Sequence, residues 1–308
     1  MAPPLLRIGT RGSPLALAQA GELKRRLAAA HASLAAPDAV EIVAIRTSGD
    51  RAGERPLAAE GSKGLFTKEI EEALLAGRVD LAIHSMKDMT ARLPRGLAIA
   101  ACLPREDPRD TLLSPQATSL ATLPKGARLG TSSLRRTALA LHARPDLAVV
   151  PLRGNVGTRL AKLEAGEADA AILAIAGLKR LGLGDKVGAI LAPEEMLPAP
   201  AQGVLAVEIR EDDARLREIV APLDHAETAC CAAAERAFLA ALDGSCRTPI
   251  AALATVAGGR LTLDAAIVRP DGGALHRARR EGPAAAAAEL GRDAGAELKA
   301  RGGPDFFA

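Results

Sequence analysis

Arg7-Ile-Gly-Thr-Arg-Gly-Ser-Pro14 is the stretch that decides the fold. Its first residues continue an apolar run that begins at Leu5, which predicts a short buried strand over Leu5–Thr10. Ser13 followed by Pro14 is typical of a helix start, because a serine side chain caps free backbone N–H groups and proline fits the first helical position. A strand that passes directly into a helix is the building unit of α/β domains.

The next ninety or so residues continue this alternation. The first helix is expected to end near Ala30, and a second helix is expected over about Thr67–Ala76. The segment Ser48–Gly64 is rich in glycine and charge and predicts a long mobile loop, which in a compact domain is usually functional. Strands are predicted at Val40–Thr47, Leu81–His84 and Leu97–Leu103.

The pattern begins again in the second third of the chain. Arg128-Leu-Gly-Thr131 matches Arg7-Ile-Gly-Thr10, and each is followed at once by a serine-capped helix. Gly166-Glu-Ala-Asp-Ala-Ala-Ile172 matches Gly77-Arg-Val-Asp-Leu-Ala-Ile83 in the same order. The repeat predicts two similarly built α/β domains.

Two proline-containing segments, Leu103–Arg109 and Leu191–Gln202, read as linkers between these domains. Two crossings make a hinge, and ligands in such folds bind in the cleft between the domains. From about Ala226 we expect a helix to Leu242, a hairpin turning at Gly258-Gly259 and a terminal helix from about Ala284, that is, a small α+β domain. The expected domains are 1–104 with 203–222, 109–198, and 226–308.

Composition narrows the classes of function. The net charge is +3, yet the four aromatic residues are all Phe, which leaves few rings to stack on bases and disfavours a nucleic-acid partner. No apolar run approaches the ~20 residues of a membrane span, and the first residues do not resemble a secretion signal. We therefore expect a cytoplasmic protein with no membrane partner.

Metal and disulfide chemistry are not indicated. Cys102, Cys230, Cys231 and Cys246 follow no paired metal-ligand spacing, and in a reducing compartment they are expected to be thiols. His84 has no second ligand at metal spacing, so packing or capping is the more ordinary role for it. No metal site is predicted.

The segment His84-Ser-Met-Lys-Asp88 carries the strongest chemical prediction. Residues at the carboxyl ends of strands in open α/β sheets face the ligand crevice. Asp88 can act there as a general acid or base, or can stabilise a developing cation. The ordinary alternative is that Lys87 and Asp88 form a solvated pair on a loop.

Arginines gather at strand-to-helix turns. Thr131-Ser-Ser-Leu-Arg-Arg136 and Arg153-Gly-Asn-Val-Gly-Thr-Arg159 repeat the device seen at Arg11. A helix N-terminus attracts anions and opposes cations, so a bound anion would compensate the arginines in the first turn. The guanidinium fork suits carboxylates and phosphates, and the absence of a phosphate-binding glycine loop favours carboxylates. Surface arginine remains the plain alternative for any single case.

Six segments together resemble one family along essentially the whole chain, the porphobilinogen deaminases (hydroxymethylbilane synthases). They are Arg7–Leu17, Gly64–Glu69, His84–Asp88, Gly130–Arg136, Arg153–Arg159 and Asp243–Pro249. The resemblance implies an α/β fold with two domains like type II periplasmic binding proteins, joined by a two-segment hinge, and a small α+β third domain. It implies a monomeric transferase that polymerises four porphobilinogen units, with loss of ammonia, to hydroxymethylbilane in tetrapyrrole (haem) biosynthesis.

The same resemblance implies roles for single residues. Asp88 matches the catalytic aspartate, and Cys246, in a turn beside Arg247, matches the cysteine that holds one dipyrromethane cofactor as a thioether. Asp50 and Lys63 fall in the segment that resembles the active-site loop. Positions matching those that hold the acidic arms of cofactor and substrate are Arg11, Ser13, Lys87, Thr131, Ser133, Arg135, Arg136, Arg153, Arg159 and Arg180.

One position departs from the family's pattern. Ala201 stands where the family usually has glycine, and alanine tolerates a positive φ far less well than glycine does. This affects the expected geometry of the hinge segment rather than the activity. A non-enzymatic solute-binding module of the same architecture is the rival hypothesis, but it would need neither His84–Asp88 nor Cys246.

Overall fold

The computed structural model describes residues 4–52, 64–245 and 248–307. The chain divides into two compact units, of which unit 1 comprises Met1–Arg105 with Val204–Ala229, and unit 2 comprises Glu106–Gly203 with Cys230–Ala308. The chain therefore passes between the units at three points. The C-terminal segment groups with the second α/β part in unit 2, and its separate domain status stays a prediction.

Unit 1 is built on a five-stranded sheet with the order β2-β1-β3-β10-β4. Its first three members in that order are parallel, while β10 runs antiparallel to both of its neighbours. The chain thus enters the sheet four times before the linker and returns once after it. The strands are β1 (Leu6–Arg11), β2 (Val40–Ile45), β3 (Leu81–Ser85), β4 (Leu97–Cys102) and β10 (Leu205–Arg210).

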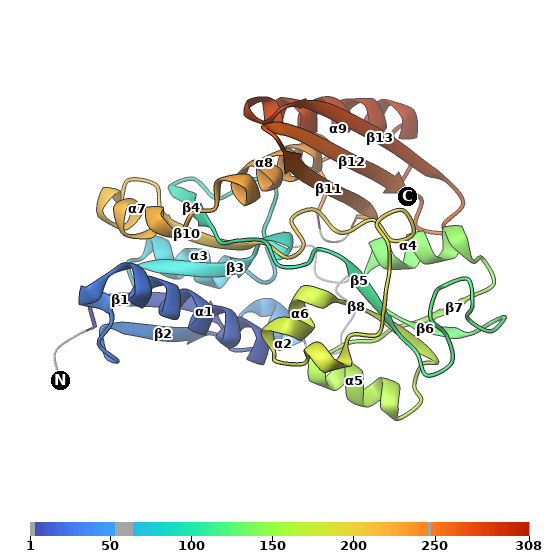
Figure 1. Cartoon of the computed structure of the whole chain (residues 1–308), viewed down its shortest axis with the longest axis horizontal. Helices are drawn as coiled ribbons and strands as arrows, with labels where there is room; N and C mark the ends of the chain where they lie inside the picture. The colour runs from blue at the N-terminus through green and yellow to red at the C-terminus, as the bar shows by residue number, and fades with distance from the viewer. Residues whose placement is uncertain (1–3, 53–63, 246–247, 308) are drawn as a thin grey trace. The chain divides into compact units, whose positions relative to one another are not determined.

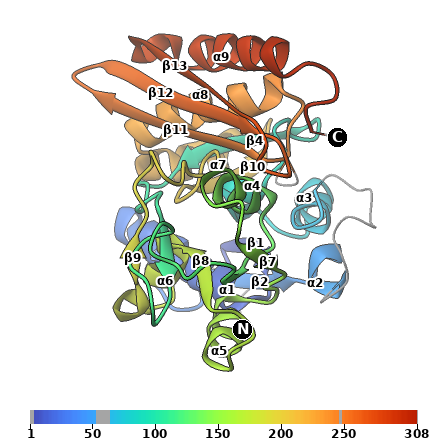
Figure 2. The ribbon, with the colours of Figure 1, turned by 90° about the vertical axis from the view of Figure 1, so that its right-hand side faces the viewer.

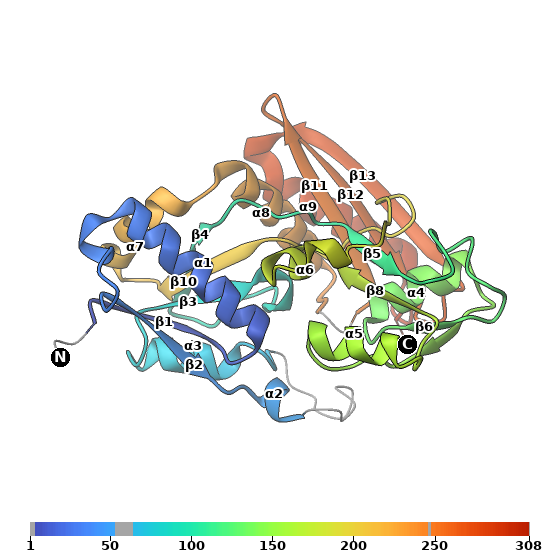
Figure 3. The same ribbon diagram turned by 60° about the horizontal axis from the view of Figure 1, so that its bottom comes forward.

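Helices cover both faces of this sheet. α1 (Pro14–Ala30) packs on β1, β2 and β3, and α7 (Ala214–Val220) packs on β4 and β10 (Figure 3). They share one apolar core that includes fully buried Leu6, Leu23 and Leu205. α3 (Lys68–Leu75) packs on β1, β3 and β10 through a second apolar cluster with Ile70 and Ala82. Each such Leu or Ile contributes roughly 1.5–3 kcal/mol by leaving water.

Unit 2 repeats the topology. Its five-stranded sheet has the order β7-β6-β8-β5-β9, in which β5 runs antiparallel to β8 and β9 (Figure 1). In each sheet one strand follows a linker, β10 in unit 1 and β5 in unit 2, and we call it n. When the other four strands of each unit are numbered in chain order, both sheets have the order 2-1-3-n-4. The predicted repeat is confirmed. The strands are β5 (Asp110–Leu113), β6 (Arg128–Gly130), β7 (Ala148–Val150), β8 (Ala170–Ala174) and β9 (Ala189–Ile190).

The helices of this sheet are α4 (Leu134–Ala143), α5 (Val156–Glu164) and α6 (Ile175–Arg180). α4 shares a core with β6 and β8, whereas α5 and α6 pack in a separate cluster around Leu113 and Leu173. The predicted caps are present, since the Ser133 side chain accepts from Arg136 N and the Asn155 side chain accepts from Thr158 N.

The C-terminal segment of unit 2 forms a three-stranded antiparallel sheet, β11 (Ile250–Ala257), β12 (Arg260–Val268) and β13 (Leu275–Pro283). α9 (Ala287–Gly302) lies across this sheet (Figure 2). α8 (Ala226–Ala241) packs tightly on α9, where a Cβ at Gly291 would lie 2.1 Å from the Ala234 carbonyl oxygen. The opposite face adds Ala251, Ala266 and Val268 to the core of α4, so this segment and the second α/β sheet share one apolar interior.

One prediction for local structure is wrong, and one strand was missed. The segment expected to be loop from Ser48 begins with a short helix, α2 (Ser48–Ala52), and the remainder to Lys63 lies outside the described residues. The strand β13 was not predicted, because its sequence Leu-His-Arg-Ala-Arg-Arg-Glu-Gly-Pro is rich in charge. It pairs only with β12 and is an edge strand, where charged side chains remain in water.

Candidate active site

The carboxyl ends of β1 and β3 bring the predicted catalytic residue Asp88 together with two predicted binding residues, Arg11 and Ser13, in unit 1. Parallel neighbouring strands end at the same edge of a sheet, and side chains that follow them meet there. Arg11 is the last residue of β1, Ser13 caps α1, and Asp88 closes a 3₁₀ turn over Met86–Asp88 directly after β3. The sequence-based grouping of these three residues is therefore present in the structure.

A small pocket of about 50 Å³ opens at this edge. Arg11, Ser13 and Asp88 line it. Sequence reasoning did not assign to the site the other polar groups around it, which are Thr10, Gln19, Thr67, His84 and Ser85.

Asp88 presents its carboxylate to the pocket. The residue is half-buried, and within the described ranges no hydrogen bond to its side chain is seen. Lys87 is half-buried beside it. A carboxylate with both oxygens available at a recessed site can accept hydrogen bonds from a ligand or steady a positive charge.

Arg11 is held on two sides. Its Nη2 donates to Asp50 Oδ1 at 2.5 Å, and its guanidinium carbon lies 4.3 Å from the centre of the Phe66 ring. Burial would raise the pKa of Asp50, but hydrogen bonds from Arg11 and Thr47 lower it below its ordinary value. Asp50 thus stays ionised and occupies the guanidinium fork that a ligand carboxylate would use.

Gln19 and Ser85 complete the floor of the pocket. Gln19 Nε2 on α1 donates to Ser85 Oγ at the end of β3, at 2.8 Å, and the glutamine is buried. This bond connects α1 to the end of β3, directly before the turn that contains Asp88. The residues are 66 apart in sequence, so no local pattern indicates the contact.

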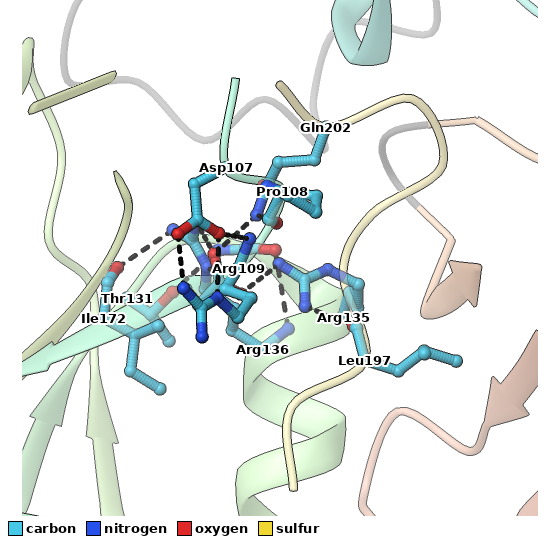
Figure 4. Close-up of polar contacts among 11 residues, drawn as sticks. Asp107, Pro108, Arg109, Thr131, Arg135, Arg136, Ile172, Leu197 and Gln202 are labelled. Atoms are coloured by element: carbon cyan, nitrogen blue, oxygen red, sulfur yellow. Dashed lines mark hydrogen bonds and ion pairs between the residues drawn. The ribbon is translucent and has the colours of Figure 1, made fainter. Parts of the chain in front are cut away.

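In unit 2, Arg135 and Arg136 converge on Asp110. All three side chains are buried, and Arg135 Nη2 and Arg136 Nη2 reach the two carboxylate oxygens at 2.7 and 2.8 Å. Arg135 Nη1 also donates to the Leu197 carbonyl oxygen, and Arg136 Nη1 donates to that of Ile172 (Figure 4). Gln202 Nε2 donates to Asp110 at 2.8 Å. Burial favours protonation of Asp110, but the two guanidinium groups hold its pKa well below the usual range.

This cluster corrects one physical expectation. The arginines in the first turn of α4 were expected to need a bound anion as compensation, and the structure supplies an internal one, Asp110 at the start of β5. Asp110 was not singled out because it follows a linker and lies 25 residues before Arg135. Whether Arg135 and Arg136 also hold a ligand stays a prediction.

The remaining predicted binding residues lie at other turns of unit 2. Thr131 is buried and accepts from Ser133 N at 3.2 Å, ahead of α4. Arg159 on α5 donates to the Gly154 carbonyl oxygen, and Arg180 on α6 donates to that of Gly203. Arg153 is half-buried before α5. Lys63 and Cys246 lie outside the described residues.

The fold and the pocket define an α/β protein with a carboxylate beside an arginine at the strand ends, the arrangement of an enzyme rather than of a simple scaffold. Two family models match, "Porphobilinogen deaminase, dipyromethane cofactor binding domain" over residues 6–218 and "Porphobilinogen deaminase, C-terminal domain" over residues 229–300. The chain belongs to the porphobilinogen deaminase family.

Relatives agree over nearly the full length. A porphobilinogen deaminase of Nitrobacter winogradskyi is 55% identical over 303 residues, covering 98% of this chain and 95% of the relative. One from Paracoccus denitrificans is 55% identical over 302 residues, covering 98% and 96%. Family membership makes the chain a transferase and disfavours the rival solute-binding module.

Solved structures show weaker likeness. A periplasmic substrate-binding protein of an ABC transporter from Coxiella burnetii is 19% identical, with a TM-score of 0.43, over 71% of this chain and 91% of that one. A methionine-bound nutrient-binding protein from Burkholderia cenocepacia is 15% identical, with a TM-score of 0.43, over 70% and 90%.

The described residues fit the cofactor that the family implies. Dipyrromethane carries acidic arms and pyrrole N–H groups, so it needs cationic and hydroxyl donors for the arms and an acceptor for the N–H groups. Unit 1 offers Arg11, Ser13 and the Asp88 carboxylate in one pocket. Unit 2 offers hydroxyl and guanidinium groups at the turns before α4 and α5.

Proposed function

We propose that this chain joins four porphobilinogen molecules head to tail, releasing one ammonia for each, and hydrolyses the product free as hydroxymethylbilane. The observation that carries this proposal is the Asp88 carboxylate, recessed in a pocket lined by Arg11 and Ser13. Family membership supports porphobilinogen as the substrate. In this proposal some residues bind the acidic arms of the substrate, and Asp88 stabilises the positive charge that develops on it.

Asp88 is proposed to stabilise the charge that develops on the substrate. Cleavage of the aminomethyl C–N bond sends the electron pair out with ammonia and leaves a positive methylene group conjugated with the pyrrole. An ionised carboxylate fixed beside that group, in a pocket with little water, lowers the energy of the cation. The same carboxylate accepts a hydrogen bond from the pyrrole N–H group and so orients the ring.

Arg11 and Ser13 are proposed to hold a carboxylate arm of the substrate. Arg11 already binds a carboxylate, that of Asp50, in the geometry a ligand would use. Exchange of Asp50 for a substrate arm keeps the guanidinium paired throughout, and the Phe66 ring keeps it in place. Lys87, Thr131, Ser133, Arg135, Arg136, Arg153, Arg159 and Arg180 are proposed to serve the other arms, with Asp50 and Lys63 in the active-site loop.

Cys246 is proposed as the attachment point of the cofactor. When bound, the dipyrromethane supplies the nucleophilic ring carbon for the first addition. The support is the match of Asp243-Gly-Ser-Cys-Arg-Thr-Pro249 to the family's segment, which lies within the region 229–300 that the family's C-terminal model matches.

We also propose that the protein works as a monomer in a reducing cytoplasm. Few large apolar side chains are exposed in the described part of the chain, namely Leu5, Leu17, Leu75, Leu134 and Ile190. Cys230 is a free thiol in the described part of the chain, which suits a reducing compartment. Separately, no helix in the described ranges is long and apolar enough to cross a membrane.

Asp88→Asn tests the proposed function. The substitution keeps size and hydrogen bonding but removes the charge, so porphobilinogen consumption by the holoenzyme is expected to fall at least about 100-fold. Asp212→Asn, at an exposed position, is the matched control and should consume porphobilinogen like wild type. Turnover of Asp88→Asn within a few-fold of the control would remove Asp88 from the mechanism.

A further inference from the structure

A buried acid–base cluster lies behind the pocket, under α3. His84 on β3, Glu208 on β10 and Glu71 on α3 are 5%, 0% and 6% exposed. His84 Nε2 lies 3.0 Å from Glu208 Oε2. Ionisable side chains with this degree of burial are rare unless they are paired or have a function.

Strand register brings the pair together. Ala206 lies opposite His84, and Glu208 lies opposite Ala82 in the antiparallel β3–β10 ladder. Side chains two residues apart share a face, so His84 and Glu208 are diagonal neighbours on the face that α3 covers. Glu71 comes from the first turn of that helix.

The hydrogen bond selects the imidazole tautomer. An ionised carboxylate only accepts, so Nε2 carries the proton and Nδ1 carries the lone pair when His84 is neutral. His84 also lines the Asp88 pocket, and within the described ranges no hydrogen bond to Nδ1 is seen. This is the arrangement in which a carboxylate orients an imidazole so that its other nitrogen can take a proton.

The charges around His84 favour this reading over a metal site. Glu208 Oε1 is buried without a hydrogen bond, which makes His84 the main polar partner of that carboxylate. Burial has the largest effect and raises the pKa of Glu71. Thr67 opposes this, the Glu208 charge adds to it and His84 opposes it more weakly, and the net result is that Glu71 holds a proton more readily than a free glutamate. Arg11 and Asp88 are the charged residues that line the same pocket as His84. No group of side chains in the described ranges is arranged to hold a metal ion.

We propose that His84 is a second acid–base group of the active site, accepting a proton at Nδ1 while Glu208 acts as its positioning residue. This deepens the proposed function and rests on it. Asp88 must stay ionised to steady a cation, so a separate neutral base can take the proton that each addition releases. The pocket volume of about 50 Å³ is enough for a water molecule beside His84, and proton transfer through one water suffices for acid–base catalysis.

The step balances as follows for every unit after the first. The ring carbon of the porphobilinogen unit joined last forms the new C–C bond, and its C–H bond then breaks. The electron pair of that bond returns to the pyrrole ring, and the proton passes to Nδ1, giving an imidazolium paired with the Glu208 carboxylate. The proton then leaves with the ammonia freed from the incoming substrate, as ammonium.

His84→Gln is the decisive variant. A glutamine side chain amide can still donate to Glu208 from near the Nε2 position but offers no titrating nitrogen in the pocket. We expect kcat for porphobilinogen to fall roughly 100-fold with KM and melting temperature little changed. Glu208→Gln should lower kcat about tenfold with KM little changed, because the imidazole loses the carboxylate that orients it. Glu218→Gln, at an exposed position on α7, is the matched control.

A second measurement is independent of turnover. In ¹⁵N spectra of histidine-labelled holoenzyme, the His84 signals are those that vanish in His84→Gln. The proposal requires a protonated Nε2 and, near neutral pH, an unprotonated Nδ1 in wild type. A protonated Nδ1 with a bare Nε2, or wild-type kcat in His84→Gln, overturns it. Failure of wild type to consume porphobilinogen would instead overturn the proposed function, while the spectra still decide the orientation of His84.

Discussion

Glu71 is a carboxyl group that the fold shields from water. Burial raises its pKa in the folded chain above the ordinary value near 4.5, and the Glu208 charge adds to that effect. A carboxyl group with a raised folded-state pKa contributes stability below its unfolded pKa and loses that contribution as the pH rises through the folded value. Glu71 therefore opposes folding most strongly in neutral and alkaline solution.

Glu71→Gln is expected to remove this pH dependence. The free energy of unfolding of the variant minus that of wild type should be more positive at pH 8 than at pH 4, because glutamine never ionises. Urea unfolding at both pH values measures the two differences. A difference that is the same at pH 4 and pH 8 would mean that Glu71 ionises as freely in the folded state as in the unfolded chain.

Ala201 adopts the backbone conformation that its place in the family pattern suggested. Its φ is +60°, in the left-handed region, and its N–H donates to the buried carboxylate of Glu235. Glu235 also accepts from Ala254 N at 2.7 Å, so the strain at Ala201 is offset by a buried hydrogen-bond pair. Alanine in this region costs roughly 1 kcal/mol.

Ala201→Gly should therefore raise the unfolding free energy by up to about 1 kcal/mol. Ala199→Gly, two residues earlier and without a positive φ, is the control and should be neutral or destabilising. Thermal or urea unfolding measures both. A less stable Ala201→Gly protein would show that the loss of the methyl group outweighs the relief of strain.

Single residues differ in how far their sequence context reveals them. Arg11, Ser13 and Asp88 could be placed because each lies at a strand-to-helix turn, and parallel strands bring such turns to one edge. The partner of His84 could not, because Glu208 lies 124 residues away and reads as one polar residue in an apolar strand. Asp110 was missed for the same reason, since only the register of β5 in its sheet buries it.

The N-terminus of α4 is anchored by charge. Arg135 and Arg136 in its first turn bind Asp110 at the start of β5, and their carbonyl partners lie at Ile172 and Leu197. The Asp110 carboxylate and its two arginines thus connect α4, β5, β8 and the linker segment Leu191–Gln202. Removal of one partner from a buried ion cluster leaves the other charges uncompensated in a medium that solvates them poorly.

Asp110→Asn should lower the unfolding free energy of unit 2 by about 3–5 kcal/mol. Asp169→Asn breaks an equally close contact with Arg128, but that pair is exposed and screened by water, so a much smaller loss is expected. Urea unfolding followed by circular dichroism compares the two. Equal losses would show that the Asp110 cluster is solvated like a surface pair.

Helices and strands with regular apolar patterns were predicted well. Elements whose structure depends on contacts with distant parts of the chain were not. β1, α1 and β3 combine caps with buried runs, so their existence and nearly their bounds follow from local sequence. β13 is a strand only because β12 offers it a ladder of hydrogen bonds from Leu275 to Pro283. α2 is short, and its Asp50 is fixed by Arg11 on another element.

The whole molecule repeats one sheet topology in two units, a relation that the matching segments of sequence indicated. What sequence could not give is the grouping of the C-terminal sheet with the second unit. That grouping comes from small residues on β11 and β12, which pack in the core of α4. Alanine contributes little to the hydrophobic periodicity of a sequence, so the packing partners of these residues are visible only in the folded chain.

The central claim is that this molecule tethers a pyrrole chain and extends it beside Asp88. Intact mass spectrometry of the purified, active enzyme tests it most directly, with Cys246→Ser run alongside. We expect wild type to exceed its sequence mass by one dipyrrole, to gain further units when porphobilinogen is limiting, and Cys246→Ser to carry none. Wild-type protein that consumes porphobilinogen at its unmodified sequence mass would contradict the account.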